Sequence, residues 1–277
     1  MSQFGNIVFI VWRESIEALL VVGILHAWLG QQDADAKRRG RKFLWSGVAA
    51  GLALAALLGA GLTLFVVALD DVARQFFQTA LMLIAAALIV QMVLWMRRHG
   101  GSLARDIHAS LQKAAGDANW WGVFFLAAIA VAREGSETVV FLAGSLSAAR
   151  DAALGAVILS ILAGLAIAIA TYALLQLGGR ALSWRTFFRV TEVMLLLLAG
   201  ALVLTGVDNL VGLGVVPRLS GRLWDTSALL GDGGAFGGLV SSLTGYRARP
   251  DLTQVVVFAL YWGLMLVLLR ASRARPA

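Results

Sequence analysis

The sequence predicts an all-α polytopic membrane protein whose chain crosses the membrane seven times. Hydrophobic residues make up 60% of the 277 residues and charged residues only 14%, whereas soluble domains average about 45–50% apolar and roughly 25% charged residues. Apolar runs of about 20 residues, long enough to cross the hydrocarbon core as a helix, recur along the whole chain. The expected spans are residues 4–30, 43–69, 75–96, 120–146, 153–177, 187–210 and 252–270.

The distribution of Lys and Arg between these spans predicts their orientation. Fifteen basic residues fall in one set of connecting segments, namely 31–42, 97–119, 178–189 and 270–277. Only six fall in the other set, which comprises the N-terminal tail, 70–74, 147–152 and 211–251. Because cytoplasmic loops carry the excess of basic residues, we expect the N-terminus outside and the C-terminus inside. Orientation in the lipid, rather than binding to nucleic acid, then accounts for the net charge of +7.

The spacing of similar segments predicts two inverted three-helix repeats within a single permease domain over residues 1–277. Arg13 and Arg133 begin two similar motifs that are 120 residues apart. An odd number of helices in each repeat inverts the second copy, which is a common plan of transporters. The expected parts are repeat one (4–96), a linker (97–119), repeat two (120–210), an outer loop (211–251) and a seventh span (252–270).

Charged residues interrupt two of the apolar runs. The stretches RESIEALL, from Arg13, and REGSETVV, from Arg133, share the pattern R-E-x-x-E. Each charge near the centre of a membrane helix costs about 2.5–3.5 kcal/mol, so the six motif charges need compensation. The five glutamates of the chain all fall within expected spans: Glu14, Glu17, Glu134, Glu137 and Glu192.

Helical geometry groups the motif charges. Residues three and four apart share a helix face, so the two glutamates of each motif lie together and each arginine can pair with the second one. If spans one and four cross at mid-membrane, four carboxylates and two guanidiniums converge with a net charge of −2. An all-oxygen cluster favours hard cations such as Mg²⁺, Mn²⁺, Ca²⁺ or Fe³⁺, or protons. The structural alternative is an ion-pair lock between two helices, which needs only one acid for each arginine.

The lack of cysteine and of a P-loop sequence excludes several other classes of chemistry. The chain has no cysteine, which excludes disulfides, thiolate metal sites and iron–sulfur clusters. It also lacks the pattern G-x-x-x-x-G-K-[ST], so hydrolysis of ATP by a P-loop is excluded.

The two R-E-x-x-E motifs in the first and fourth spans resemble those of the oxidase-dependent iron permeases. The stretches LWDTSALL and LTGYRARPDLTQVVVFALYWG look like the bacterial branch of that family, and the resemblance covers nearly the whole chain. It implies high-affinity import of iron, as ferric iron supplied by oxidation at the outer face, across the cytoplasmic (inner) membrane. It also implies a periplasmic or extracellular partner that oxidises or delivers iron. Iron is then the transported ion, with no permanently bound cofactor.

The resemblance assigns roles to the matched residues. Glu14, Glu17, Glu134 and Glu137 are the expected transient iron ligands, and Arg13 and Arg133 are the expected supporting ion-pair partners.

Four further acids are secondary candidates: Glu192, with Arg189 or Thr191 as an expected partner, and Asp70, Asp71 and Asp208 at the outer ends of spans. In the outer loop, RLWDTSALL and FGGLVSSLTGY are candidates for short interfacial helices.

Three alternative functions remain open at this point. The same carboxylates would serve an importer or a proton-coupled exchanger of another cation, such as Mn²⁺ or Fe²⁺. A membrane di-iron oxidase would use E-x-x-H pairs, and none of the five glutamates has His three residues later. A structural subunit that anchors a redox partner would need the outer loop but not the motif acids. The energy source and the oligomeric state are not determined by the sequence.

Overall fold

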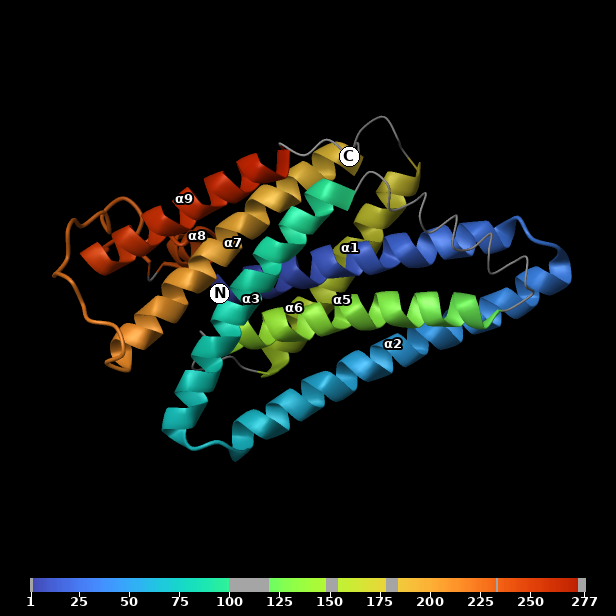
Figure 1. Ribbon diagram of the computed structural model, residues 1–277, viewed down its shortest axis with the longest axis horizontal. Coiled ribbons are helices and arrows are strands. Elements are labelled where there is room, and N and C mark those ends of the chain that lie inside the picture. The colour runs from blue at the N-terminus through green and yellow to red at the C-terminus, as the bar shows by residue number, and fades with distance from the viewer. Residues whose placement is uncertain (1, 100–119, 148–153, 178–183, 233, 274–277) are drawn as a thin grey trace.

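The computed structural model describes residues 2–99, 120–147, 154–177, 184–232 and 234–273 (Figure 1). Nearly all of the described chain is helical. The seven long helices are α1 (Ser2–Gly30), α2 (Ala34–Ala68), α3 (Asp71–His99), α5 (Trp121–Ser147), α6 (Leu154–Leu177), α7 (Trp184–Gly212) and α9 (Leu252–Arg273). The short helix α8 (Ala235–Thr244) lies in the long connection before α9. Each of the seven expected spans coincides with one long helix, and most of the expected 97–119 linker lies outside the described residues.

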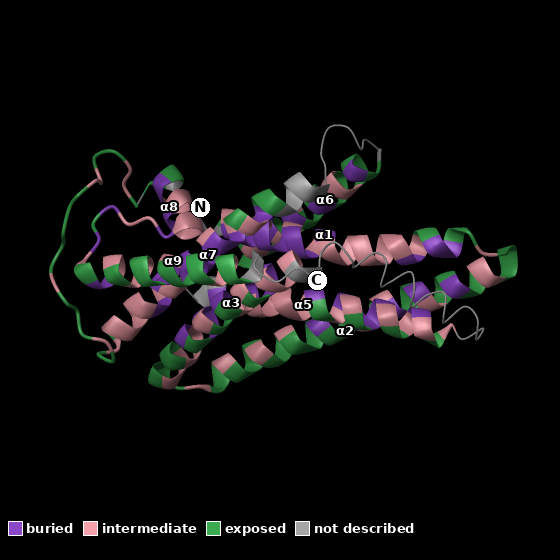
Figure 2. Cartoon of the chain, turned by 45° about the horizontal axis from the view of Figure 1, so that its top comes forward, coloured by how far each residue is buried: buried purple, intermediate pink, exposed green. Residues whose placement is uncertain are grey.

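Five of the long helices have the length and apolar composition of membrane spans: α2, α3, α6, α7 and α9. The other two, α1 and α5, are as long but carry the charged motifs in their middle. Large apolar side chains cover the outside of the bundle, for example Leu64 on α2 and Leu260 on α9. Figure 2 shows these outer faces as exposed. Exposed apolar surface of this extent fits lipid rather than water.

The two charged helices lie side by side at the centre and run in opposite directions (Figure 1). The end of α1 packs on the start of α5, because Leu25 and Leu29 form one buried cluster with Val123 and Ala127. Around this pair, α2 packs along α5, α6 packs along α1, and α3 packs against α7. The motifs of α1 and α5 therefore meet inside the bundle.

Glycines bring α2 close to α5 and α6 close to α1. A Cβ atom on Gly51 of α2 would lie 2.8 Å from the carbonyl oxygen of Ala128 and 2.8 Å from Cβ of Val131. A Cβ atom on Gly164 of α6 would lie 2.8 Å from the carbonyl oxygen of Val8 and 2.9 Å from Cβ of Val11. Small residues let membrane helices approach closely, and dispersion contacts then hold them together. A close glycine contact therefore occurs twice, once between α2 and α5 and once between α6 and α1.

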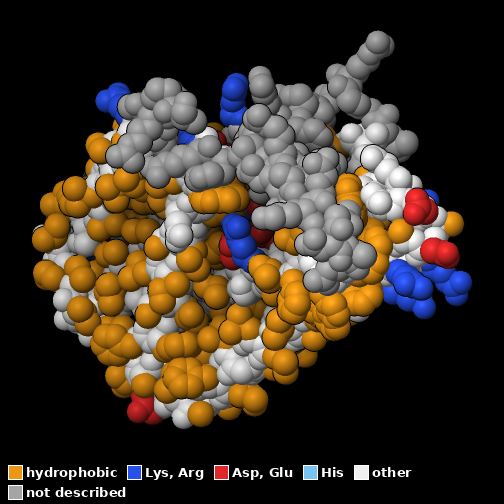
Figure 3. Space-filling model, turned by 45° about the vertical axis from the view of Figure 1, so that its right-hand side comes forward, with side chains coloured by type: hydrophobic (Ala, Val, Ile, Leu, Met, Phe, Trp, Pro, Cys, Tyr) orange, Lys and Arg blue, Asp and Glu red, His pale blue; other side chains and the backbone are white. Residues whose placement is uncertain are grey.

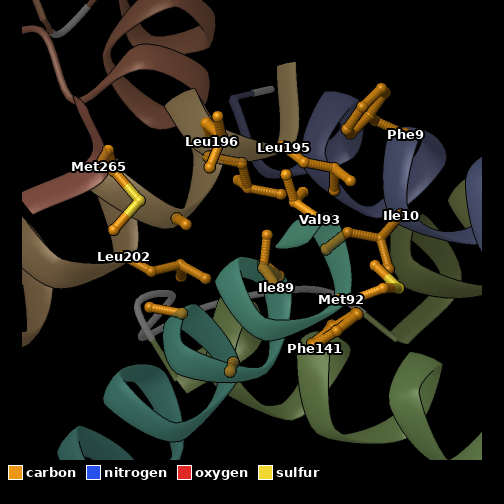
Figure 4. Close-up of a cluster of buried hydrophobic side chains, with 14 of the residues drawn as sticks. Phe9, Ile10, Ile89, Met92, Val93, Phe141, Leu195, Leu196, Leu202 and Met265 are labelled. Carbon is orange, nitrogen blue, oxygen red and sulfur yellow. The ribbon is translucent and has the colours of Figure 1, made fainter. Parts of the chain in front are cut away.

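A buried apolar cluster packs α3, α7 and α9 against the two motif helices. Phe9 and Ile10 of α1, Ile89 and Met92 of α3, and Phe141 of α5 meet side chains of α7 and α9 (Figure 4). Tyr261 of α9 also donates a hydrogen bond to the carbonyl oxygen of Leu196, at 2.6 Å. This packing fixes α3 next to the motif helices, which matters for the site because α3 supplies several of its contacts.

The connection between α7 and α9 is ordered by its own polar contacts. The amide and hydroxyl groups of Ser227 donate to Asp225 at 2.9 and 2.5 Å, and Arg249 pairs with the same carboxylate at 2.8 Å. These interactions, led by the Ser227 hydroxyl, lower the pKa of Asp225 to about 2. Of the two expected loop helices, only the second is helical, as α8, which ends at Gly245 with a φ of 76°. Residues 222–226 instead lie antiparallel to 248–251, because the amides of Leu223 and Thr226 donate to the carbonyl oxygens of Pro250 and Ala248, and residues 227–229 form a turn.

The close contact of α2 with α5 predicts unequal effects of two alanine substitutions on the same helix. At Gly51, the nearest atoms to a new Cβ are mainly backbone atoms of α5, at 2.8–2.9 Å, so Gly51→Ala must push the helices apart. We expect a loss of about 1–3 kcal/mol, the usual cost of overpacking. Gly61→Ala is the matched control, because no atom lies within 4 Å of its Cβ. Thermal unfolding in detergent should show a lower midpoint for Gly51→Ala only; equal midpoints would contradict this packing.

Candidate functional site

The first half of the site is built by one helical turn of α1. Arg13 and Glu14 are almost fully buried, with 1% and 2% of their surface exposed, and Glu17 lies one turn further along the same helix. Arg13 pairs with Oε1 of Glu14 at 2.8 Å and also pairs with Glu17. The i to i+4 spacing therefore produces the expected ion pair within the helix.

Two methionines of α3 complete the surroundings of Arg13. Its guanidinium donates to Sδ of Met92 at 3.0 Å and to Sδ of Met96 at 3.1 Å. Thioether sulfur is a weak acceptor, but it contributes soft, polarisable packing around a group that has left water. The Nε atom of Arg13 has no hydrogen-bond partner in the described part of the chain. Arg13 is thus held from two helices at once.

The second half of the site is built by α5 and is more open. Glu134 is buried, with 8% of its surface exposed, whereas 43% of the Arg133 side chain is exposed. Arg133 pairs with Glu137 at 3.0 Å and approaches Glu134 at 3.7 Å. Its guanidinium also lies over the ring of Trp95, 5.0 Å from the centroid, in a cation–π contact.

Carboxylates from both helices converge where α1 and α5 meet. One oxygen from each of Glu14, Glu17 and Glu134 lies within 4.8 Å of the others. Each of these side chains, and Glu137, also has a buried oxygen that accepts no hydrogen bond from the described residues. For Glu17 this is the oxygen that pairs with Arg13. Converging carboxylates that keep buried oxygens free of hydrogen bonds are a suitable ligand set for a hard cation.

Two cavities adjoin the carboxylates. One, of about 370 Å³, is lined mainly by apolar residues of α1, α2 and α5 and includes Glu14 and Glu134. The other, of about 230 Å³, lies between α3 and α5 and is lined by Leu88, Gln91, Met92, Trp95, Arg133 and Glu137. Figure 3 shows acidic and basic side chains in a hollow that is bordered by hydrophobic side chains. The carboxylate cluster therefore has open space on more than one side.

The four secondary candidates lie outside this cluster. Glu192 of α7 forms an ion pair with Arg97 of α3, a partner that the sequence did not suggest. Asp70 accepts a hydrogen bond from the amide of Ala73 at 2.7 Å and so caps α3. The side chain of Asp71 is 93% exposed. Asp208 accepts from Gln254 of α9 at 2.8 Å and faces Arg247 at 3.6 Å. These acids have local partners, and none belongs to the three-carboxylate group.

Sequence reasoning missed the contribution of α3. Met92, Met96 and Trp95 contact motif residues, and Arg97 contacts the partly buried Glu192, yet the methionines and Trp95 look like ordinary packing residues in the sequence. The spacing of Met92 and Met96, four apart on one helix, was the available signal. It does not reveal which helix they face, so their contact with Arg13 becomes visible only after the bundle is assembled.

The fold and the site together define a class of protein: a multi-pass integral membrane protein with a buried carboxylate cluster between two antiparallel helices. The sequence profile of the Iron permease FTR1 family matches residues 5–273. The chain belongs to the Iron permease FTR1 family, as the two motifs indicated. It is therefore a membrane permease of an iron-transport family, in accord with the expected location in the cytoplasmic membrane.

Curated relatives support the same assignment over most of the chain. The protein is 29% identical over 266 residues to the Ferrous iron permease EfeU of Escherichia coli O6:H1 (strain CFT073), covering 91% of this chain and 90% of that protein. It is 26% identical over 262 residues to the Ferrous iron permease EfeU of Yersinia pestis, covering 91% and 88%. No solved structure matches the chain.

The burial of Arg13 predicts a large loss of stability when its charge is removed. In Arg13→Met, the buried Glu14 and Glu17 lose their shared partner. Breaking a buried ion pair from one side costs about 3–5 kcal/mol. Arg218→Met is the control, because the pair of Arg218 with Asp251 is exposed at the arginine side and such pairs contribute about 0–1 kcal/mol. Thermal unfolding in detergent measures both variants. An Arg13→Met protein as stable as the parent would show that the charge is not needed there.

Proposed function

We propose that the protein imports iron as Fe²⁺ across the cytoplasmic membrane, using Glu14, Glu17 and Glu134 as transient ligands. The observation that carries the proposal is the convergence of these three carboxylates, from two helices, within 4.8 Å. Carboxylate oxygens bind hard cations and also borderline ones such as Fe²⁺. Membership of the iron permease family selects iron among them.

The choice of Fe²⁺ departs from the ferric ion that the motif resemblance implied. Both relatives named above are called ferrous iron permeases. Charge balance favours the same ion. Three ionised carboxylates and the Arg13 guanidinium carry a net charge of −2, which one divalent cation neutralises in a medium where uncompensated charge is costly. A ferric ion would leave one positive charge unmatched unless a fourth acid joined the group. A partner at the outer face that oxidises or delivers iron stays a prediction.

The proposal includes seven membrane spans, with the N-terminus outside, and two inverted repeats. The uneven distribution of basic residues supports the orientation. The exchanged glycine contacts support the repeats: Val8 and Ala128 are 120 positions apart, as are Val11 and Val131, and Arg13 and Arg133. In this arrangement the ion would sit at the interface of the repeats, where alternating access is achieved by moving one repeat against the other.

Substitution of the three clustered glutamates tests the ligand assignment. Glu14→Gln, Glu17→Gln and Glu134→Gln keep the size of the side chain but remove one ligand charge each. Changes around metal sites commonly lower affinity about 10–100-fold even when they do not touch the metal, so we expect uptake to fall at least about tenfold. The measurement is uptake of radioactive iron in cells without other iron importers, at matched membrane levels of each variant.

The matched control is Asp71→Asn, which removes a carboxylate whose side chain is 93% exposed and should leave uptake unchanged. Ferrous iron and ferric iron are supplied separately, and Mn²⁺ is added as a competitor. Normal uptake by all three glutamine variants would overturn the ligand assignment and favour an ion-pair lock. Uptake from ferric iron alone would overturn the choice of Fe²⁺.

A further inference from the structure

The two motif arginines occupy matching positions but very different surroundings. Arg13 is enclosed, with 1% of its surface exposed, and is held by two glutamates and two methionine sulfur atoms. Arg133 lines the cavity of about 230 Å³ between α3 and α5, and 43% of its side chain is exposed. The motifs are alike in sequence, so this difference arises from the way the other helices pack around them.

The contacts of Arg133 are of a kind that can be exchanged. Its closest partner is Oε1 of Glu137 at 3.0 Å, on the same helix. Its second contact is a cation–π contact with the ring of Trp95, which lies on α3 and lines the same cavity. Ion pairs that water reaches are weak because solvent competes for both charges, and an aromatic face attracts a cation without fixing its position. Arg133 can therefore leave Glu137 and stay over Trp95 without entering an apolar region.

Glu137 adjoins both the cavity and Glu134, one of the three clustered glutamates. It lines the cavity, and it lies three residues after Glu134, on the same helix face. It does not belong to the three-carboxylate group. One of its oxygens pairs with Arg133, and the other is buried and accepts no hydrogen bond from the described residues. A metal cation in the cavity therefore meets the Glu137 carboxylate, of which one oxygen is already paired with the Arg133 guanidinium.

We propose that Arg133 is a displaceable counter-ion that controls passage between this cavity and the three clustered glutamates. The inference rests on the carboxylate site of the proposed function. A metal cation takes the place of the guanidinium at Glu137, Arg133 withdraws onto Trp95, and the pair re-forms when the ion has moved on. Arg13 keeps its place throughout, because its four contacts come from two helices.

Displacement of an internal cation also selects by charge. A monovalent ion brings to Glu137 no more charge than the guanidinium that it replaces, and it must give up its own hydration. A divalent ion brings twice the charge and binds the same carboxylate more strongly. The Arg133–Glu137 pair thus excludes monovalent ions that would otherwise be attracted to a cluster of acids.

The absence of cysteine from the chain makes accessibility directly measurable with single cysteines. In membrane vesicles opened to both sides, a charged methanethiosulfonate reagent should modify Arg133→Cys but not Arg13→Cys. The reporter of cavity occupancy is Gln91→Cys, on the α3 wall of the same cavity. Ferrous ions, added without oxygen, should slow the modification of Gln91→Cys. Sodium ions at equal ionic strength should not.

The proposal predicts how second substitutions change this protection. Glu137→Gln in the Gln91→Cys protein should abolish the slowing by ferrous ions. Trp95→Leu should keep the protection but slow uptake, because the displaced guanidinium loses its support. Asp71→Asn is the matched control and should change neither. Absence of slowing in the otherwise native reporter, or slowing that survives Glu137→Gln, would overturn the proposal, as would equal modification of the two arginine-to-cysteine variants.

A further variant distinguishes a failure of the exchange at Arg133 from a failure of the ligand assignment. Glu17→Gln should lower uptake at least about tenfold and yet leave ferrous ions able to slow modification of Gln91→Cys, since Glu137 is intact. If Glu17→Gln keeps normal uptake while the protection still depends on Glu137, the ligand assignment fails and the exchange at Arg133 stands. If uptake depends on Glu17 but the protection is absent, the exchange at Arg133 fails and the ligand assignment stands.

Discussion

The burial of Arg13 among carboxylates is the constraint on which the rest of the structure depends. A guanidinium and a carboxylate removed from water lose far more solvation than ordinary packing returns, unless they face each other with good geometry. α1 satisfies part of this need by helical spacing alone, through Glu14 and Glu17. The remainder comes from α3, whose methionine sulfur atoms close the space around the guanidinium. The position of α3 is consequently tied to the charge on α1.

Close helix packing makes this arrangement possible. Gly51 and Gly164 let α2 and α6 approach α5 and α1 to backbone contact, so the two charged helices are enclosed by apolar helices on their outer sides. Because lipid is as apolar as leucine, such packing depends on dispersion and fit rather than on exclusion of water. The apolar helices face the lipid, and the charged helices face one another.

A difference between the two motif helices connects this structure to transport. Both helices are contacted through a glycine, Gly164 against α1 and Gly51 against α5, but the surroundings of their two arginines differ. A transport site has to bind its ion and also release it, so it benefits from weak and exchangeable contacts at one side. In the proposed exchange, the enclosed contacts of Arg13 on α1 stay in place, and the open contacts of Arg133 on α5 are the ones that change.

The sequence by itself determined the helices and the grouping of charges within each helix. The apolar runs correspond to α1, α2, α3, α5, α6, α7 and α9, because length and composition decide whether a segment can be helical in lipid. The pairs Arg13–Glu17 and Arg133–Glu137 follow from a spacing of four residues. The family of the protein was also visible there, since the two motifs carry it.

Only the tertiary structure decided which charges meet between helices. It placed Glu134, but not Glu137, with Glu14 and Glu17, paired Glu192 with Arg97, and used Asp70 as a helix cap. These contacts depend on where helices cross and how they are rotated about their axes. Crossing and rotation result from side-chain packing over the whole bundle, which the spacing of residues within one helix does not encode.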